Sequence, residues 1–365
     1  MNVCLIGDGL TSLTLAKALI NNNLKVFMYA KSNNKKSSLN RTIGITQSNM
    51  EFFKREILKI SKNLIWNINE IEIYDEENKI LSFDNSNKNL FYIIKNNDLF
   101  NSLNNNLKKN NNFKKIKIKN KSFYKKILKS NKYDLIINCD ERNEINKKLF
   151  YQKFLKDYKS TAYVAIINHK KINNHKALQI FTKLGPIAFL PVSEMQTCVV
   201  YSIRDDLVNN SKLSQIEFTN LVFKKNKLYK IKSINNFESS FLKGKILKKY
   251  YNKNILSFGD ILHQIHPLSG QGFNMTLRDI NVLLNLIKEK KNLGLSINNS
   301  IFKEFENKTK HLNFIFSSGN DFIYEFFNNE KYYLKLFSKK IFSKLSNNRL
   351  FNKIAVKYAD RGLIF

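Results

Sequence analysis

The chain has 365 residues, of which 43% are hydrophobic, a length sufficient for one large α/β domain or two interleaved ones. Its formal net charge is +33, from 62 Lys and Arg against 29 Asp and Glu. The basic residues are spread along the whole chain and accompany many Asn, Ile and Phe, whose codons are AT-rich. We interpret the charge as compositional bias on a solvated surface and expect no nucleic-acid partner, whereas an anionic membrane surface stays open as a partner.

The three cysteines, Cys4, Cys139 and Cys198, lie in apolar segments without a pairing motif. Unpaired cysteines of this kind predict reduced thiols and a cytoplasmic location. A peripheral position on the inner face of the cytoplasmic membrane is compatible with that location. No run of 18 or more apolar residues occurs, so we expect no transmembrane helix. Because the first residues already read as a strand, no signal peptide is expected.

The N-terminal half reads as an alternation of strands and helices. Residues 2–6 predict a buried strand, 10–21 an amphipathic helix and 24–29 a second strand, which is a βαβ opening. Further on, helices are predicted at 48–58 and 98–107, and strands at 70–74, 91–94, 115–119 and 133–139.

From residue 161 the pattern becomes all-β. Four strands with short connections, at 162–167, 177–182, 187–192 and 197–203, indicate an antiparallel sheet. A helix at 213–223, a buried strand at 254–258, a helix at 276–288 and a nearly all-helical segment from residue 301 follow. The chain therefore predicts a parallel sheet assembled from distant pieces, with an antiparallel layer inserted between them.

The turn after the first strand is Gly7-Asp8-Gly9-Leu10-Thr11-Ser12, which fits the pattern Gly-x-Gly-x-x-Ser. Gly7 allows the tight turn, Gly9 lets the backbone approach a pyrophosphate, and the helix from Leu10 offers its N-terminal amides to that phosphate. We predict dinucleotide binding here, although an ordinary βα turn would look the same. The acidic residue expected at the end of the second strand is absent, because Ala30 and then Lys31 stand there. The adenosine end of the dinucleotide must therefore be bound more weakly, or by other groups.

A second motif, from Ser257 to Asn274, is more specific. A buried strand runs into Gly259-Asp260, and His263, Pro267, Gly270-Gln271-Gly272, Asn274 and then Arg278-Asp279 follow. The segment resembles that of the class A flavoprotein monooxygenases, and among them the ubiquinone-biosynthesis hydroxylases, which carry Gly-Asp-Ala-Ala-His before the Pro and Gly-Gln-Gly. Here Ile261-Leu262 replaces the two alanines.

This resemblance implies an α/β fold, with a Rossmann-like FAD-binding domain of the glutathione-reductase type, an inserted antiparallel substrate sheet and C-terminal helices. It implies that Asp260 binds a ribityl hydroxyl of FAD. It also implies that Pro267, Gly270 and Gly272 form the catalytic loop beside the flavin ring, whose reduced N1/O2 edge a helix N-terminus would stabilise. The cofactor-binding residues expected are Gly7, Gly9, Leu10, Thr11, Ser12, Arg41, Asp140, Gly259, Asp260, Pro267, Gly270, Gln271, Gly272, Phe273 and Asn274.

Three shorter segments extend the resemblance and also depart from it. Arg41 follows the second strand where the family has an Arg, and residues 92–99 resemble the segment before a helix that flanks FAD, with Asn97 in place of Arg. Residues 134–141 resemble the Asp-Gly motif for FAD and NAD(P)H, with Asp140 kept and Glu141 in place of Gly. The departures at Ala30, Asn97 and Glu141 all concern the adenosine and nicotinamide contacts.

The function implied is hydroxylation of the aromatic ring of a polyprenylated phenol in ubiquinone biosynthesis. NAD(P)H would reduce the flavin, and a C4a-hydroperoxyflavin would transfer one oxygen atom. We expect Phe181, Phe189 and His266 to contact the substrate. Two alternatives stay open: another flavin enzyme of this fold with a different substrate, and a non-catalytic member of a quinone-synthesis complex.

The expected domain division assigns 1–60, 96–155 and 246–300 to FAD binding, 61–95 and 156–245 to the substrate domain, and 301–365 to a C-terminal helical region. His263 and His266 are three residues apart, but without Cys or paired carboxylates we expect no metal site. The segment 332–358 alternates apolar and basic residues, which fits either helices packed on the body or a basic amphipathic surface that meets a membrane.

Overall fold

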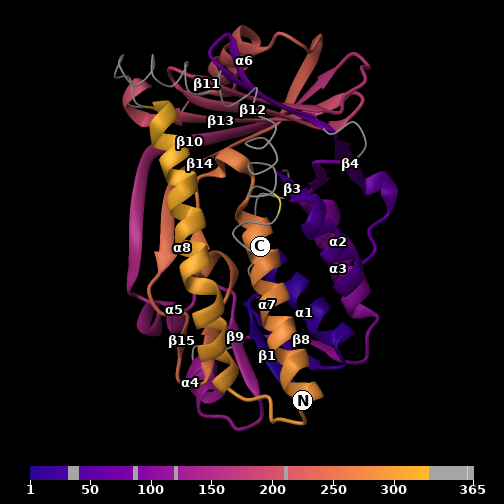
Figure 1. Cartoon of the computed structure of the whole chain (residues 1–365), viewed down its shortest axis with the longest axis vertical. Coiled ribbons are helices and arrows are strands. Elements are labelled where there is room, and N and C mark those ends of the chain that lie inside the picture. The colour runs from indigo at the N-terminus through magenta and orange to yellow at the C-terminus, as the bar shows by residue number, and fades with distance from the viewer. Residues whose placement is uncertain (32–40, 85–88, 119–121, 209–212, 329–359, 361–365) are drawn as a thin grey trace.

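The computed structural model describes residues 1–31, 41–84, 89–118, 122–208, 213–328 and 360. The predicted amphipathic segment 332–358 lies outside these described residues. A parallel sheet with its helices occupies one end of the molecule, a large second sheet occupies the other, and one long helix runs along both (Figure 1). The predicted mixed α/β fold with an inserted sheet is confirmed.

The first sheet has six strands in the order β15-β16-β9-β1-β2-β8, parallel throughout except for the antiparallel pair β15 and β16. Its strands are β1 (Asn2–Ile6), β2 (Lys25–Ala30), β8 (Phe113–Lys117), β9 (Leu135–Asn138), β15 (Tyr251–Asn252) and β16 (Ile255–Ser257). Strands from three distant parts of the chain therefore lie side by side, as the sequence predicted.

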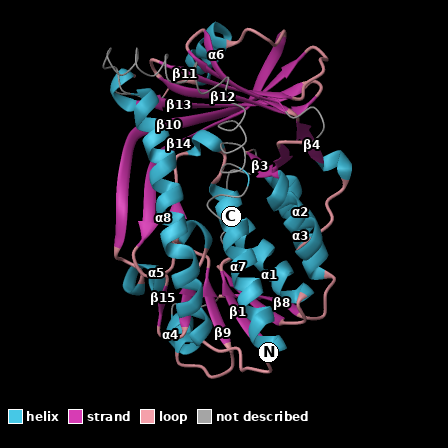
Figure 2. Ribbon diagram, in the orientation of Figure 1, coloured by secondary structure: helices cyan, strands magenta, loops and turns pink. Residues whose placement is uncertain are grey.

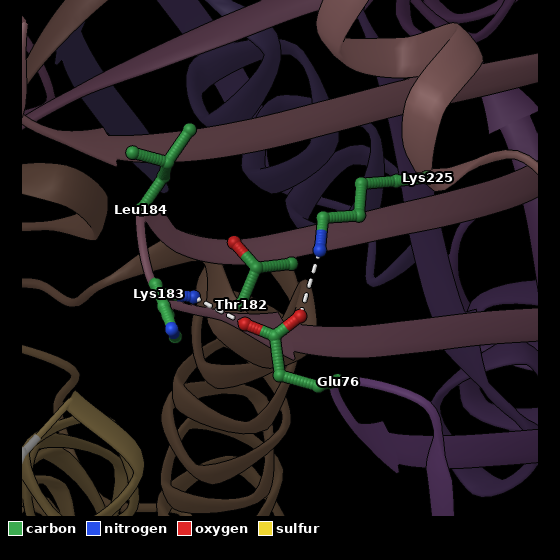
Figure 3. A pocket seen from close by; sticks show the side chains of 5 residues that line it. All are labelled: Glu76, Thr182, Lys183, Leu184 and Lys225. Atoms are coloured by element: carbon green, nitrogen blue, oxygen red, sulfur yellow. Dashed lines mark hydrogen bonds and ion pairs between the residues drawn. The ribbon is translucent and has the colours of Figure 1, made fainter.

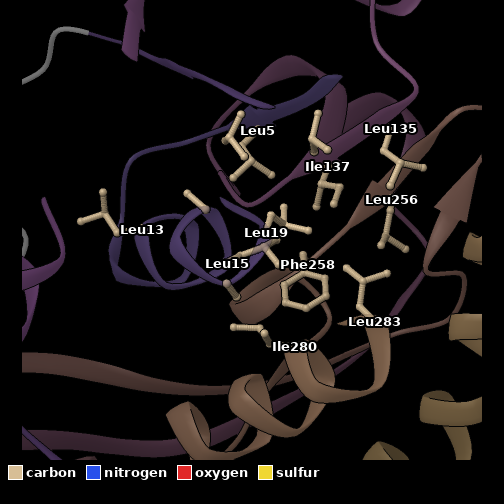
Figure 4. Packing of buried hydrophobic residues seen from close by; sticks show 14 of the residues in the cluster. Leu5, Leu13, Leu15, Leu19, Leu135, Ile137, Leu256, Phe258, Ile280 and Leu283 are labelled. Atoms are coloured by element: carbon tan, nitrogen blue, oxygen red, sulfur yellow. The ribbon is translucent and has the colours of Figure 1, made fainter. Parts of the chain in front are cut away.

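Apolar residues on both faces of these strands explain their burial. Around the sheet are α1 (Leu10–Asn21), α2 (Gln47–Glu56), α3 (Asn96–Lys108), α4 (Ser122–Leu128), α5 (Glu144–Leu149) and α7 (Gly272–Asn292). In the core between strands, α1 and α7, side chains such as Leu5, Leu19, Ile137, Phe258 and Leu283 interdigitate (Figure 4). Such burial contributes about 1.5–3 kcal/mol for each large apolar side chain.

The second sheet has eight strands in the order β17-β14-β10-β13-β12-β11-β5-β6. They are β5 (Glu70–Asp75), β6 (Asn78–Asp84), β10 (Lys153–His169), β11 (Lys176–Thr182), β12 (Gly185–Ser193), β13 (Gln196–Arg204), β14 (Ile231–Leu247) and β17 (His263–Gln264). The four strands predicted from residue 161 are confirmed. The sheet is not purely antiparallel, however, because β5 pairs with β11 in parallel.

The 17-residue strand β14 has no counterpart in the sequence analysis. Asn236 has a left-handed backbone (φ +57°), and the register with β10 shifts between Val164 and Ile166. Such irregularities displace residues from one face to the other, so the period-2 pattern that would reveal the strand is broken.

The two faces of this sheet have different coverings. Helix α6 (Gln215–Lys225) packs through Phe218 and Val222 on the outer face, against Phe189 and Tyr201. The inner face carries Val164, Ile166 and Cys198, and turns toward the nucleotide-binding end.

A third sheet of three strands, β3 (Thr42–Thr46), β7 (Phe91–Lys95) and β4 (Ile65–Ile68), packs against part of the inner face. The predicted domain boundaries cut through hydrogen-bonded sheets. β4 and β7 were assigned to the substrate domain but pair with β3, and β17 of the FAD-binding segment pairs with β14. The division stays a prediction.

Helix α8 (Ser300–Asn328) connects the two ends of the molecule (Figure 2). Its Glu306 accepts a hydrogen bond from the backbone N–H of Tyr250, and near its end Phe327 stacks on Phe181 of the large sheet. Four short 3-10 turns complete the described elements: Lys62–Leu64, Asp205–Leu207, Gly259–Ile261 and Pro267–Ser269. Among the described helices, none is long and apolar enough to cross a membrane. The three cysteines are unpaired, as expected.

Candidate cofactor and substrate site

The glycine turn after β1 leaves the N-terminus of α1 accessible. Gly7 has φ +112°, and its N–H donates to the carbonyl of Tyr29, which places the turn beside the end of β2. A Cβ on Gly7 would lie 3.2 Å from Asp140, so glycine is needed there. A Cβ on Gly9 would meet no atom within 4 Å, and no side chain caps α1 at this end. The first amides of α1 therefore face open space with the positive end of the helix dipole.

The second motif is packed directly against the first. Gly259 has φ +69°, and a Cβ on it would lie 2.5 Å from the Cγ2 atom of Thr11. This contact joins the two predicted motifs, which are about 250 residues apart in the chain. Only glycine satisfies both the left-handed backbone and the close approach.

Asp260 follows this glycine and remains exposed, although protein groups surround it. Desolvation raises the pKa of its carboxyl above the ordinary value, and the negative charge of Glu141 adds to this effect. The positive charges of His263, Lys245 and Arg41 act in the opposite direction. Asp260 is therefore an accessible carboxylate that lacks full hydration, which makes it ready to accept hydrogen bonds from a ligand hydroxyl.

The loop from Pro267 leads into α7. Pro267–Ser269 form a 3-10 turn, Gly270 has φ +60°, and Gly272 is the first residue of the helix. A Cβ on Gly270 or Gly272 would meet no atom within 4 Å, and no side-chain hydrogen bond caps α7. The structure thus provides a second accessible helix N-terminus, in which glycine leaves the backbone amides uncovered.

Asn274 and His263 hold this loop in place from behind. The Oδ1 atom of Asn274 accepts from the N–H of Thr46 and its Nδ2 atom donates to the carbonyl of Gly44, at 3.0 and 2.9 Å. His263 bonds through Nε2 to the Oδ2 atom of Asp279 at 2.7 Å, with both side chains buried. Their polar atoms are directed at the protein, so these residues position the loop.

The remaining predicted cofactor residues lie around the same region. Gln271 accepts a hydrogen bond from Arg278, and Phe273 is partly buried against the core. Ser12 is fully buried at the start of α1. Arg41 reaches from β3 to the large sheet, where its Nη2 atom donates to Ser240 at 3.0 Å.

Glu141, which stands where the family motif has Gly, forms an ion pair with Lys245. The Oε1 and Nζ atoms are 2.6 Å apart, and the Lys245 side chain is only 5% exposed. Because a buried ammonium needs a partner, the two residues are a matched pair that sequence reasoning missed. The glutamate at position 141 is thus accompanied by Lys245 of β14, whose positive charge it neutralises.

The predicted substrate residues separate into two environments. Phe181 lies on β11, and its ring stacks on Phe327 with centroids 3.8 Å apart. Phe189 lies on the opposite face of the sheet, in the closed core beneath α6. Phe181 pairs with Pro186, whereas Phe189 pairs with Leu178, so the register places the two rings on opposite faces.

His266, directly before the loop proline, is fully buried between two tyrosines. Its ring centroid lies 5.0 Å from that of Tyr158 and 4.0 Å from that of Tyr324, and neither ring nitrogen has a hydrogen-bond partner among the described residues. Burial lowers the pKa of His266 to about 3, so the imidazole is neutral at neutral pH. Buried polar atoms without a partner are unusual in proteins. His266 lies where the loop before Pro267 packs against Tyr158 of β10 and Tyr324 of α8.

A separate pocket of about 400 Å³ lies at the far edge of the large sheet (Figure 3). Glu76 accepts there from the N–H of Lys183 at 2.8 Å and pairs with Lys225 at 2.7 Å. These charges already satisfy one another, and the pocket contains none of the predicted site residues.

Comparison with known proteins gives the family and the fold of the chain. The family model described as squalene epoxidase matches residues 134–358, more than half of the chain. The chain belongs to this family. Among curated relatives, the ubiquinone hydroxylase UbiM of Neisseria meningitidis is 30% identical over 155 residues, which are 41% of this chain and 34% of UbiM. The ubiquinone hydroxylase UbiL of Rhodospirillum rubrum is 25% identical over 201 residues, 54% of this chain and 47% of UbiL.

A third relative, the 3-demethoxyubiquinol 3-hydroxylase of Escherichia coli, is 26% identical over 155 residues, 41% of this chain and 39% of the relative. The matches thus span less than half the length of each of these relatives. Among solved structures, p-nitrophenol 4-monooxygenase PnpA of Pseudomonas putida superimposes with TM-score 0.75 at 12% identity, covering 98% of both chains. HpxO of Klebsiella pneumoniae, complexed with FAD and uric acid, gives TM-score 0.74 at 10% identity, covering 99% of this chain and 97% of HpxO. These likenesses establish the fold.

Proposed function

We propose that the chain is an FAD-dependent monooxygenase that hydroxylates the aromatic ring of a polyprenylated phenol in ubiquinone biosynthesis. The observation that carries the proposal is that the Gly259–Ile261 turn, which includes Asp260, contacts Thr11 at the uncapped start of α1 and also contacts α7, whose start is uncapped as well. This set fits a ligand with a pyrophosphate, a polyol and a ring that gains negative charge on reduction. The similarity to two ubiquinone hydroxylases and a 3-demethoxyubiquinol 3-hydroxylase supports the substrate class.

The residues of the chain would divide the work as follows. The amides after Gly9 hold the pyrophosphate, Asp260 accepts from a ribityl hydroxyl, and the amides that begin α7 stabilise negative charge on the flavin ring. Bound FAD, reduced by NAD(P)H, would supply the oxygen-activating chemistry. Asn274 and His263 keep the loop in position.

The substrate would lie between the loop and the inner face of the large sheet. Val164, Ile166 and Cys198 form an apolar wall there, and Phe181 lies on the same face. These side chains are 0–7% exposed, so the wall would exclude water beneath an apolar substrate. Because Phe189 lies beneath α6, the proposal gives it no substrate contact and assigns it to the core.

The same proposal includes a cytoplasmic location and contact with an anionic membrane surface, where a polyprenylated substrate would be found. The formal net charge of +33 supports attraction to such a membrane. Membership of a ubiquinone-biosynthesis complex is a further part of the proposal, compatible with either a catalytic or a non-catalytic role.

The test is direct. Purified protein should carry FAD, or take it up when reconstituted, and should consume oxygen with NADH or NADPH in the presence of a short-chain prenylated phenol. Mass spectrometry should find a product heavier by one oxygen atom. Flavin binding without such a product on any phenol would favour a different flavin enzyme of this fold, and protein that cannot bind flavin would favour the non-catalytic alternative.

A further inference from the structure

The carboxyl end of β2 is where a carboxylate is missing. Ala30 ends this strand, and the sequence contains no Asp or Glu from there until Glu51. The neighbouring strand β8 and the segment after it, residues 113–133, contain none either. In dinucleotide-binding folds the residue at this place binds the ribose hydroxyls of the adenosine.

A carboxylate reaches this place from the turn after β1. The Oδ2 atom of Asp8 lies 2.8 Å from the Nζ atom of Lys115, which belongs to β8. Since the strand order is β1-β2-β8 and Lys115 pairs with Met28, a contact between the turn after β1 and Lys115 crosses β2 close to its carboxyl end. The hydrogen bond from Gly7 to Tyr29 fixes the turn beside that end.

The carboxylate is accessible as well as fixed in place. The side chains of Asp8 and Lys115 are 43% and 40% exposed, so a ligand can reach them. Two other carboxylates lie near the turn. Asp140 follows β9, where it accepts from the N–H of Arg142, and Asp260 follows β16. Both strands lie on the side of β1 away from β2, so of the three carboxylates Asp8 is the one that crosses β2.

We infer that Asp8 takes the place of the missing carboxylate and accepts hydrogen bonds from the ribose hydroxyls of the adenosine of FAD, an inference that rests on the proposed function. Lys115 holds the carboxylate over β2. Its positive charge also offsets the repulsion that Asp8 would otherwise exert on the nearby pyrophosphate. The adenosine end is thus bound from the glycine turn itself, in which Asp8 was no more than a spacer between two glycines in the sequence pattern.

The experiment compares FAD with FMN, which lacks the adenosine half. Apoprotein is titrated with each flavin, and the dissociation constants are read from flavin fluorescence. Asp8→Ala should weaken FAD binding by about tenfold to a hundredfold, the range for hydrogen bonds to a charged group, and should leave FMN binding unchanged. Placing the carboxylate at the usual position, in the double variant Asp8→Ala with Ala30→Glu, should restore part of the FAD affinity.

The matched control is Asp134→Asn, which replaces an exposed carboxylate at the amino end of β9 that bonds to the N–H of Asn2. It should change neither constant. An Asp8→Ala variant that binds FAD within twofold of the unsubstituted protein, or that loses FAD and FMN equally, overturns the inference while the proposed function stands. Unsubstituted protein that binds neither flavin overturns both.

Discussion

The two ends of the proposed cofactor site are built on different principles. At the ring end, the loop from Gly259 to Asn274 would bind through backbone shape, and the family pattern is kept there except for Ile261 and Leu262. At the adenosine end, binding would depend on side chains, and the pattern has changed at Ala30 and Glu141. A backbone amide cannot be supplied by another residue, whereas a carboxylate can arrive from a neighbouring turn or strand. Loss of a family residue at a site that binds through side chains therefore does not mean loss of binding.

The largest expected effect tests whether the ring end depends on glycine. Both Gly259 and Gly270 have left-handed backbones, so alanine at either costs about 1–2 kcal/mol. At Gly259 the Cβ would also strike Thr11, and overpacking adds about 1–3 kcal/mol. Urea unfolding should therefore show a loss of about 3 kcal/mol or more for Gly259→Ala and about half of that for Gly270→Ala. Equal losses would contradict the close contact with α1.

The second prediction concerns Asp260, which should act on both flavins. Asp260→Asn should weaken FAD and FMN by the same factor, about tenfold to a hundredfold, because the ribityl chain is common to both. An effect confined to FAD would instead indicate that Asp260 contacts the adenosine half of the cofactor, and would contradict the proposed difference between the two ends of the site.

The same variant should stabilise the apoprotein. The folded pKa of Asp260 is raised, so between the unfolded and folded pKa values the folded state binds more protons, and stability falls as the pH rises through this window. At neutral pH the neutral amide avoids that cost, and thermal unfolding of apo Asp260→Asn should occur at a higher temperature than that of the unsubstituted apoprotein. The difference should disappear in acid.

A third prediction tests the pair that replaced the family glycine. Glu141→Gly restores the family residue but leaves Lys245 buried without its partner. We expect a loss of about 1–2 kcal/mol, less than for a fully buried pair because Glu141 is 44% exposed. The double variant with Lys245→Met should recover most of this loss in urea unfolding. If the single variant is as stable as the unsubstituted protein, the pair is not compensatory.

The smallest effect at moderate pH comes from His266. The unfolded chain protonates this histidine near pH 6.5, whereas burial lowers the pKa in the folded state to about 3. The unfolded state therefore binds more protons as the pH falls, and stability decreases by up to about 1.4 kcal/mol per pH unit in this window. His266→Gln should flatten the decline measured by calorimetry between pH 6.5 and 5. The exposed His311→Gln should leave it unchanged.

The sequence predicted the fold and both glycine-containing motifs because these depend on local patterns. It did not reveal that Gly259 contacts Thr11, because no local pattern encodes a packing contact between distant segments. Likewise, Phe181 and Phe189 appeared equivalent as aromatic residues of one sheet. The register of β11 with β12 separates them, and periodicity alone does not fix the register between two strands.

The site shows the same limit. Asn274 carried the expectation of a cofactor contact, yet its amide is engaged with Thr46 and Gly44. Asp8 carried no expectation at all. Its position over β2 follows from the strand order, which a single sequence does not contain.

Helix α8 has a consequence for how the chain can vary in length. Its Asn313 bonds to Asp279, its Asn320 to the carbonyl of His266, and its Tyr324 to Ser160. One face of the helix therefore forms hydrogen bonds with three separate parts of the molecule. An extra residue inserted before Asn313 would rotate all three by about 100° and shift them by about 1.5 Å. The exposed residues Ile315 and Ile323 would then take the buried positions of Phe316 and Tyr324. The number of residues in this helix therefore sets the distance between the loop at Pro267 and the large sheet.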